Sequence, residues 1–217
     1  MKRIGSAMAV AAALAFASPA AAQLAFDLKA VYGMPTGDAV KLGGVEQVSG
    51  AMKNFWSGEV PIEVAGRWRF SPSFSAGVYF QYAPAFVAAR ICPPDGSCSG
   101  SDVRVGVEAV YAFRPEGFLN PWVSLGTGWE WSTLSIAIPT DSAKVTCSGW
   151  EFFNVQAGLD FNLSKMFAIG PYLGYFGGSF STVSGTWSGV PQGPTIPSEF
   201  RAFHGWFQLG AKGTINL

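Results

Sequence analysis

Trp150-Glu151-Phe152-Phe153-Asn154-Val155-Gln156-Ala157-Gly158-Leu159-Asp160-Phe161-Asn162-Leu163 is the stretch that decides the fold. Apart from its first few residues, the odd positions are apolar and the even positions are polar or very small. Successive side chains of a β-strand point to opposite faces, so this segment has one apolar and one polar wall. It is also much longer than an ordinary globular strand of about five to six residues.

The same alternation recurs along the chain. We expect eight strands, at about 24–33, 58–70, 74–84, 102–114, 121–132, 149–163, 166–179 and 201–217. Most of these segments have the length that a tilted strand needs to cross a membrane, about 9–11 residues. The chain is 49% hydrophobic and only 13% charged, whereas about a quarter of the residues of soluble proteins are charged. No run approaches the ~18 apolar residues of a membrane-spanning helix, so we expect the apolar walls of strands to face lipid.

The connections between these segments alternate in length. Short turns are expected at about 71–73, 114–120 and 164–165. Four long loops are expected at about 34–57, 85–101, 133–148 and 180–200. Alternating short turns and long loops are typical of bacterial outer-membrane barrels. The prediction is an all-β fold: an eight-stranded antiparallel up-and-down transmembrane β-barrel with four long extracellular loops.

Residues 1–22 have the features of a cleaved signal peptide. Lys2 and Arg3 are followed by an apolar run, Met8 to Ala17, and by Ala20-Ala21-Ala22, which offers a cleavage site. The apolar run is too short to span a bilayer as a helix. We therefore expect export, with residues 23–217 forming one β-barrel domain in the bacterial outer membrane.

The polar faces of the strands predict a charged interior. Eight strands enclose a space just wide enough to be filled by side chains. By alternation, the inward-facing charged residues are Asp27, Lys29, Glu63, Arg67, Arg69, Asp102, Arg104, Glu108, Arg114, Glu130, Asp160 and Lys212. Six basic side chains meet six acidic ones, and a buried charge is costly unless it is paired. We expect a network of salt bridges, with Arg104 beside Glu130 and Asp27 beside Lys212, rather than a gated ion path.

Pro61 and Pro171 interrupt two of the expected strands. Each removes a backbone donor from the hydrogen-bond ladder, and a closed barrel has no free edge at which to place it. We expect a local β-bulge at each proline.

The three cysteines leave the disulfide pattern open. Cys92 and Cys98 are separated by Pro-Pro-Asp-Gly-Ser, a turn-forming segment, and exported proteins keep disulfides. We expect these two to pair and Cys147 to stay free, although Cys147 has either of the others as an alternative partner. Three thiols without a histidine at ligand spacing do not form a zinc pattern, and no metal or other cofactor is predicted.

His204 is the one histidine of the chain. Outer-membrane lipid hydrolases use a histidine with a serine two residues further along the same strand, but Trp206 stands there. We therefore interpret His204 as a rim residue bonded to loop backbone and predict no catalytic site.

The leader, the loop alternation and segments such as Gly149 to Phe161 resemble the small outer-membrane β-barrel family of OmpA/OmpX type. The resemblance implies a structural or surface-interaction role. It implies contact with outer-membrane lipid and lipopolysaccharide, and with the barrel-assembly machinery and periplasmic chaperones during biogenesis. The long loops are candidates for an extracellular ligand, and the charge balance shows no nucleic-acid signature. The alternatives are a narrow porin or conduit for small molecules, and a lipid-modifying enzyme.

Overall fold

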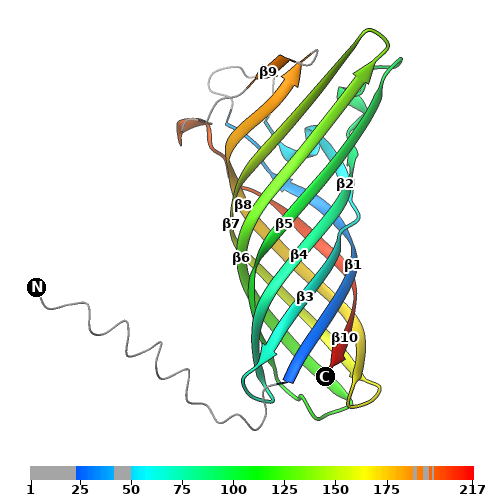
Figure 1. The fold of residues 1–217 in the computed structure, drawn as a ribbon, viewed down its shortest axis with the longest axis vertical. Helices are drawn as coiled ribbons and strands as arrows, with labels where there is room; N and C mark the ends of the chain where they lie inside the picture. Colours follow the sequence, from blue (N-terminus) through cyan, green and yellow to red (C-terminus); the bar gives the residue numbers. More distant parts are fainter. Residues whose placement is uncertain (1–22, 42–49, 188–189, 193–195, 197) are drawn as a thin grey trace, which may run out of the picture.

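The polar–apolar alternation of the sequence is realised in strands that pair edge to edge around a closed ring (Figure 1). The computed structural model describes residues 23–41, 50–187, 190–192, 196 and 198–217. The predicted signal peptide and parts of the first and fourth expected loops lie outside these residues. No helix among the described residues is long and apolar enough to cross a membrane.

The described residues contain ten strands and three short 3-10 helices. The strands are β1 (Gln23–Gly37), β2 (Trp56–Glu59), β3 (Ile62–Arg69), β4 (Phe74–Val87), β5 (Ser97–Ala112), β6 (Leu119–Ile138), β7 (Asp141–Asn162), β8 (Phe167–Trp187), β9 (Val190–Gln192) and β10 (His204–Asn216). The 3-10 helices are η2 (Met52–Asn54), η3 (Ala89–Ile91) and η4 (Ser198–Phe200). β2 and β3 occupy one position in the wall, and β9 adds to β8, so the ring has the predicted eight positions.

The first and last strands close the barrel. β1 pairs with β10 from Ala25 opposite Asn216 to Gly37 opposite His204, and β10 pairs with β8 on its other side. All neighbours are antiparallel, as expected for an up-and-down barrel. We call the end with the three short turns the turn end, which is the lower end in Figure 1, and the opposite end the loop end.

The two faces of the wall follow the predicted alternation. In β7, Val155 is 47% exposed and Gln156 is fully buried. Large apolar side chains cover the outer face. Aromatic side chains exposed toward the turn end are Trp68, Phe70, Phe74, Phe113 and Phe167, and those exposed toward the loop end are Tyr82, Trp131, Trp150 and Phe203. Such aromatic belts are typical of barrels at the two interfaces of a membrane.

The bulges expected at the prolines are absent from the described strands. The register of β4 is the same on both sides of Pro61, because Glu59 pairs with Ala85 and Ile62 with Tyr82. Pro171 pairs with Ala211 in an unshifted ladder. Each proline removes a backbone donor from the ladder but does not insert an extra residue into the strand. The Pro61 carbonyl still accepts a hydrogen bond from the Val31 amide at 3.1 Å.

A bulge occurs instead in β7, between Glu151 and Phe153. Both phenylalanines of this segment point outward or partly outward, Phe152 being 52% exposed, and the alternation changes phase there. Beyond the bulge Trp150 is exposed and Glu151 is buried. The first residues of the segment, which the predicted alternation did not include, therefore follow the opposite phase.

The third expected long loop, residues 133–148, is almost entirely strand. β6 and β7 continue their ladder to Ile138 opposite Asp141, which leaves a tight hairpin. The two arms contain the β-branched residues Thr133, Ile136, Ile138, Val145 and Thr146, and residues of this kind favour extended backbone. With the adjoining ends of β5 and β8 and with β9, this hairpin forms a sheet that rises beyond the barrel, which we call the projecting sheet (Figure 1).

Replacing Val155 by Arg should impair insertion of the barrel into lipid, because a charged side chain near the bilayer midplane costs about 2–4 kcal/mol. Ser142, exposed near the hairpin tip of the same strand, provides the control substitution to Arg. The measurement is the folded fraction in lipid vesicles, from the mobility shift between unboiled and boiled samples. Equal folding of the two variants would contradict the assigned faces.

Candidate functional site

The lumen of the barrel changes character along its axis. A polar cavity lies at the turn end, buried charges fill the middle, and aromatic and aliphatic side chains fill the loop end. Each zone is formed by inward-facing residues of several strands. The closure of the ring therefore determines which side chains come into contact in the lumen.

The cavity at the turn end has a volume of about 820 Å³. Its polar lining includes Arg67, Arg69, Asp160 and Lys212. Arg67 pairs with Asp27 at 2.6 Å and donates to Ser75 at 2.8 Å.

Lys212 pairs with Asp160 at 2.9 Å and lies 3.8 Å from the centre of the Trp122 ring. Asp27 instead accepts from Arg67 and from Thr214, the latter at 2.7 Å. Asp27 and Lys212 lie at similar heights on the paired strands β1 and β10, as expected. Each nevertheless has its closest ion-pair partner on another strand.

The middle of the lumen is organised around the Lys29 ammonium group. It contacts the carboxylates of Glu63 at 2.5 Å and Glu108 at 3.4 Å, and it donates to Gln156 at 2.8 Å. Gln81 donates to the other Glu63 oxygen at 3.0 Å and also bonds to Arg104. Bonded side chains thus connect this layer to the next one toward the loop end.

The next layer, which we call the Arg104 layer, contains one guanidinium and four carboxyl groups. Arg104 lies 3.0 Å from Asp102, 3.0 Å from Glu130, 3.3 Å from Glu59 and 3.7 Å from Glu151. These five side chains are at most 4% exposed. An isolated charge buried to this degree would be strongly unfavourable. Arg104 offsets part of this cost by contacting carboxyl groups from several strands at once.

Apolar side chains close the lumen above the Arg104 layer. We call this group the apolar plug: Met52, Trp56, Ala85, Phe176, Phe180, Ile196 and Trp206. The Arg104 guanidinium carbon lies 5.4 Å from the Phe176 ring centre and 5.7 Å from the Trp206 ring centre. Cation–π contacts of this kind join the charged layer to the plug. The expectation of a polar interior therefore fails at the loop end, where large aromatic residues occupy inward positions.

Most of the predicted interior residues are buried together, with two departures. The buried ones are Asp27, Lys29, Glu63, Arg67, Asp102, Arg104, Glu108, Glu130, Asp160 and Lys212. Arg69 is only partly buried and donates to Asn216. Arg114 is exposed, because β5 ends at Ala112 and the alternation no longer applies beyond it.

Glu59 and Glu151 are buried in the lumen but were not predicted there. Glu59 has the same odd parity as Glu63 and Arg67, so the alternation could have identified it. Glu151 could not be found in this way, because the β7 bulge reverses the phase. With these two, the described lumen holds eight buried carboxyl groups against four buried lysines and arginines.

His204 is buried and contacts side chains rather than loop backbone. Its Nε2 lies 2.8 Å from Glu130 Oε2, and its ring stacks on Phe180 with 3.9 Å between centroids. The neighbouring position expected for a catalytic serine is filled by Trp206, which belongs to the apolar plug. His204 is thus almost fully buried at the start of β10.

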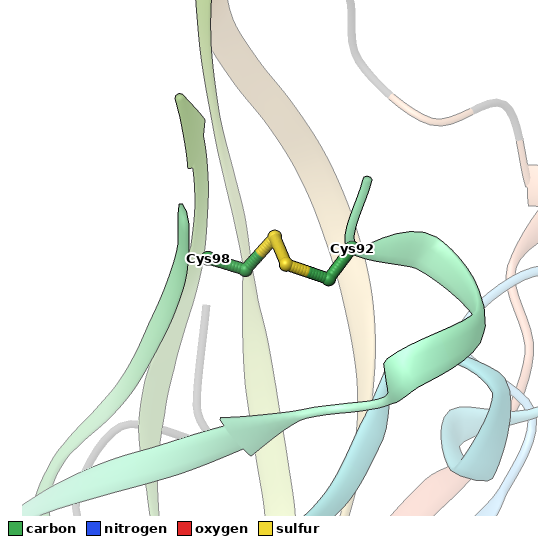
Figure 2. The surroundings of a disulfide bond; sticks show 2 residues. All are labelled: Cys92 and Cys98. Atoms are coloured by element: carbon green, nitrogen blue, oxygen red, sulfur yellow. A yellow bond between two sulfur atoms is a disulfide. The ribbon is translucent and has the colours of Figure 1, made fainter. Parts of the chain in front are cut away.

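Cys92 and Cys98 form a disulfide, and Cys147 is a free thiol. Figure 2 shows the two side chains meeting between the end of η3 and the start of β5. The bond therefore ties the connection after β4 to an edge of the projecting sheet. Within the described residues, no group of three or more His, Cys, Asp or Glu is arranged to hold a metal ion.

Replacing Lys29 by Met should strongly destabilise the barrel, because Glu63 and Glu108 would lose their shared cation. Breaking a buried pair on one side typically costs about 3–5 kcal/mol. The measurement is urea unfolding in lipid vesicles, with exposed Lys165→Met as the control. Adding Glu63→Gln to Lys29→Met should recover part of the loss, and a Lys29→Met protein as stable as the control would contradict the role of this layer.

Solved structures of low sequence identity share this architecture. A major outer membrane protein from Thermus thermophilus is 10% identical, and the match covers 91% of this chain and 100% of that chain with a TM-score of 0.61. The outer membrane protein OprG from Pseudomonas aeruginosa is 11% identical, with 90% and 96% covered and a TM-score of 0.50. No protein-family model and no curated protein sequence matches the chain. At such identities the likeness concerns the fold alone: this chain has the fold of bacterial outer-membrane β-barrel proteins.

Proposed function

We propose that this protein is an integral outer-membrane protein of OmpA/OmpX type whose barrel is a closed scaffold for the projecting sheet. Its role would be structural or in surface interaction. The observation that carries this proposal is the filled lumen, in which Lys29, Glu63, Gln81 and Arg104 form a bonded chain beneath the apolar plug.

The outer wall of the barrel supports a position in lipid. Large apolar side chains on all the main strands are exposed, and aromatic belts border them. In lipid, each backbone donor and acceptor must be bonded within the protein, and a closed ladder meets this condition. Outer-membrane lipid and lipopolysaccharide would be the contacts of this wall.

The projecting sheet supports a role at the surface. It continues the rigid ladder of the barrel, and the Cys92–Cys98 disulfide braces the segment that enters β5. Recognition by proteins is usually carried by loops on a rigid scaffold. An extracellular ligand would therefore bind at the projecting sheet or at the connections beside it.

A second candidate function is a conduit for small apolar molecules. It is favoured by the apolar plug, since Trp56, Phe176, Phe180 and Trp206 would present apolar surface to a molecule entering from the loop end. The charged layers beneath oppose passage along the axis, because burying an apolar molecule among them would separate ion pairs. A lipid-modifying activity at His204 has less support, because the ring is buried against Phe180 and Glu130.

Cysteine labelling tests the proposed display of the sheet. In a Cys147→Ser background, Ser142→Cys at the hairpin tip should react with a membrane-impermeant maleimide on intact cells. Lys165→Cys, in the turn between β7 and β8, is the matched control and should react only after the outer membrane is permeabilised. Labelling of both positions on intact cells, or only of the turn, would contradict the proposed orientation.

Planar-bilayer recordings separate a closed scaffold from a conduit. The refolded protein should insert without producing stable conductance steps, because the Lys29 and Arg104 layers fill the cross-section. A porin added afterwards to the same bilayer serves as the positive control. Stable steps from the protein alone, or protein-dependent entry of a hydrophobic dye into vesicles, would favour the conduit instead.

A further inference from the structure

The Arg104 layer holds more negative charge than its cations balance. Glu59 comes from β2, Asp102 from β5, Glu130 from β6 and Glu151 from β7. Arg104 is their shared permanent cation. If all four carboxyl groups were ionised, the layer would carry three uncompensated negative charges. Burial of unpaired charge is so unfavourable that such groups neutralise instead.

The other groups around the layer do not remove the imbalance. β10 contributes His204, which contacts Glu130, and β4 contributes Tyr79, whose hydroxyl donates to Glu151 at 2.7 Å. The Cys147 thiol of β7 packs against the apolar plug. From β8 come the Phe176 and Phe180 rings of the apolar plug. The nearest cation toward the turn end, Lys29, is already bound by two carboxylates of its own. Even a charged His204 would leave two negative charges in excess.

Asp102 and Glu130 lie against the same nitrogen of Arg104. One guanidinium cannot balance both carboxylates as well as Glu59 and Glu151. A proton on one of them removes a buried negative charge from the layer. Arg104 Nη2 is 3.0 Å from one oxygen of each group, and His204 occupies the other Glu130 oxygen.

The partners of the two groups decide which one holds the proton. Glu130 receives bonds from Arg104 and contacts His204, which favours its ionised form. Asp102 receives no hydrogen bond from any described donor at either oxygen. Its contact with Arg104 is an ion-pair contact that Glu130, Glu59 and Glu151 share.

We propose that Asp102 holds a bound proton at neutral pH, as a neutral acid among the carboxyl groups around Arg104, while Glu130 stays ionised. The Arg104 layer is then a proton-binding site inside the barrel. Loss of the proton to solvent would add another buried anion beside Arg104 Nη2. Arg104 joins the site to the apolar plug, so that change would extend to the loop end of the lumen.

The bound proton links the stability of the barrel to pH. The unfolded chain releases an aspartic acid proton above about pH 4, whereas the folded barrel keeps this one at neutral pH. The folded state therefore binds more protons, and stability falls as the pH rises above that range. One proton changes the folding equilibrium constant by up to about tenfold per pH unit.

Asp102→Asn tests the proposal, because the amide has nearly the shape of the neutral acid and cannot ionise. Compared with the wild type, the variant should gain stability as pH rises from 5 to 7, up to about 100-fold in the equilibrium constant. At pH 7 it should be at least as stable as the wild type. Glu63→Gln is the matched control, since Glu63 is an equally buried carboxyl group with Lys29 as its own cation, and it should be destabilised at pH 7. Unfolding is followed by urea titration in lipid vesicles.

Infrared spectroscopy gives a readout that does not depend on folding energetics. The folded wild type at pH 7 should show carbonyl stretching absorption from protonated carboxyl groups, and Asp102→Asn should lose the part that comes from Asp102 while Glu63→Gln keeps it. The proposal is overturned if the wild type lacks this absorption or if Asp102→Asn leaves it unchanged. It is overturned equally if Asp102→Asn is as destabilised at pH 7 as Glu63→Gln and keeps the wild-type pH dependence.

Discussion

The pairing of β1 with β10 is the contact on which the rest of the structure depends. A sheet in lipid cannot leave a row of backbone groups unbonded, so the two ends of the chain must meet. Their register, from Ala25 opposite Asn216 to Gly37 opposite His204, fixes which residues of the last strand face inward. His204, Gln208 and Lys212 then lie among side chains from the first three-quarters of the sequence, bonding to Glu130, Glu59 and Asp160.

The contents of the lumen follow from what this closure buries. Long charged side chains reach across a narrow space and find partners on distant strands, as Lys29 does with Glu63, Glu108 and Gln156. Toward the loop end, aromatic rings replace these pairs, and the side chains of the Arg104 layer are almost completely buried. A low-polarity cover strengthens the interactions beneath it and makes any surplus charge more costly. The apolar plug therefore raises the energetic cost of the acidic surplus beneath it.

The sequence was informative where one rule, alternation, determines the outcome. It predicted the fold class, the eight wall positions and the cross-strand neighbours Arg104 and Glu130. It failed where the phase or length of a strand depends on pairing: at the β7 bulge, and at residues 133–148, which extend as strand because β6 and β7 support each other. The partners of Asp27 and Lys212 depend on side-chain reach across the lumen. Position along a strand does not contain that information.

The β7 bulge has a consequence for how this chain tolerates changes in length. Phe152 and Phe153 together oppose a single residue, Thr127, of β6. They separate two phases of the inward–outward alternation. Odd-numbered residues such as Val155 face outward on one side of the bulge, and even-numbered residues such as Trp150 face outward on the other. Deleting either phenylalanine would straighten the ladder and leave every other side chain on its present face. Deleting a residue elsewhere in the strand would exchange the inward-facing and outward-facing side chains of one part of β7. Insertions and deletions within β7 should therefore be confined to this site and to the hairpin tip.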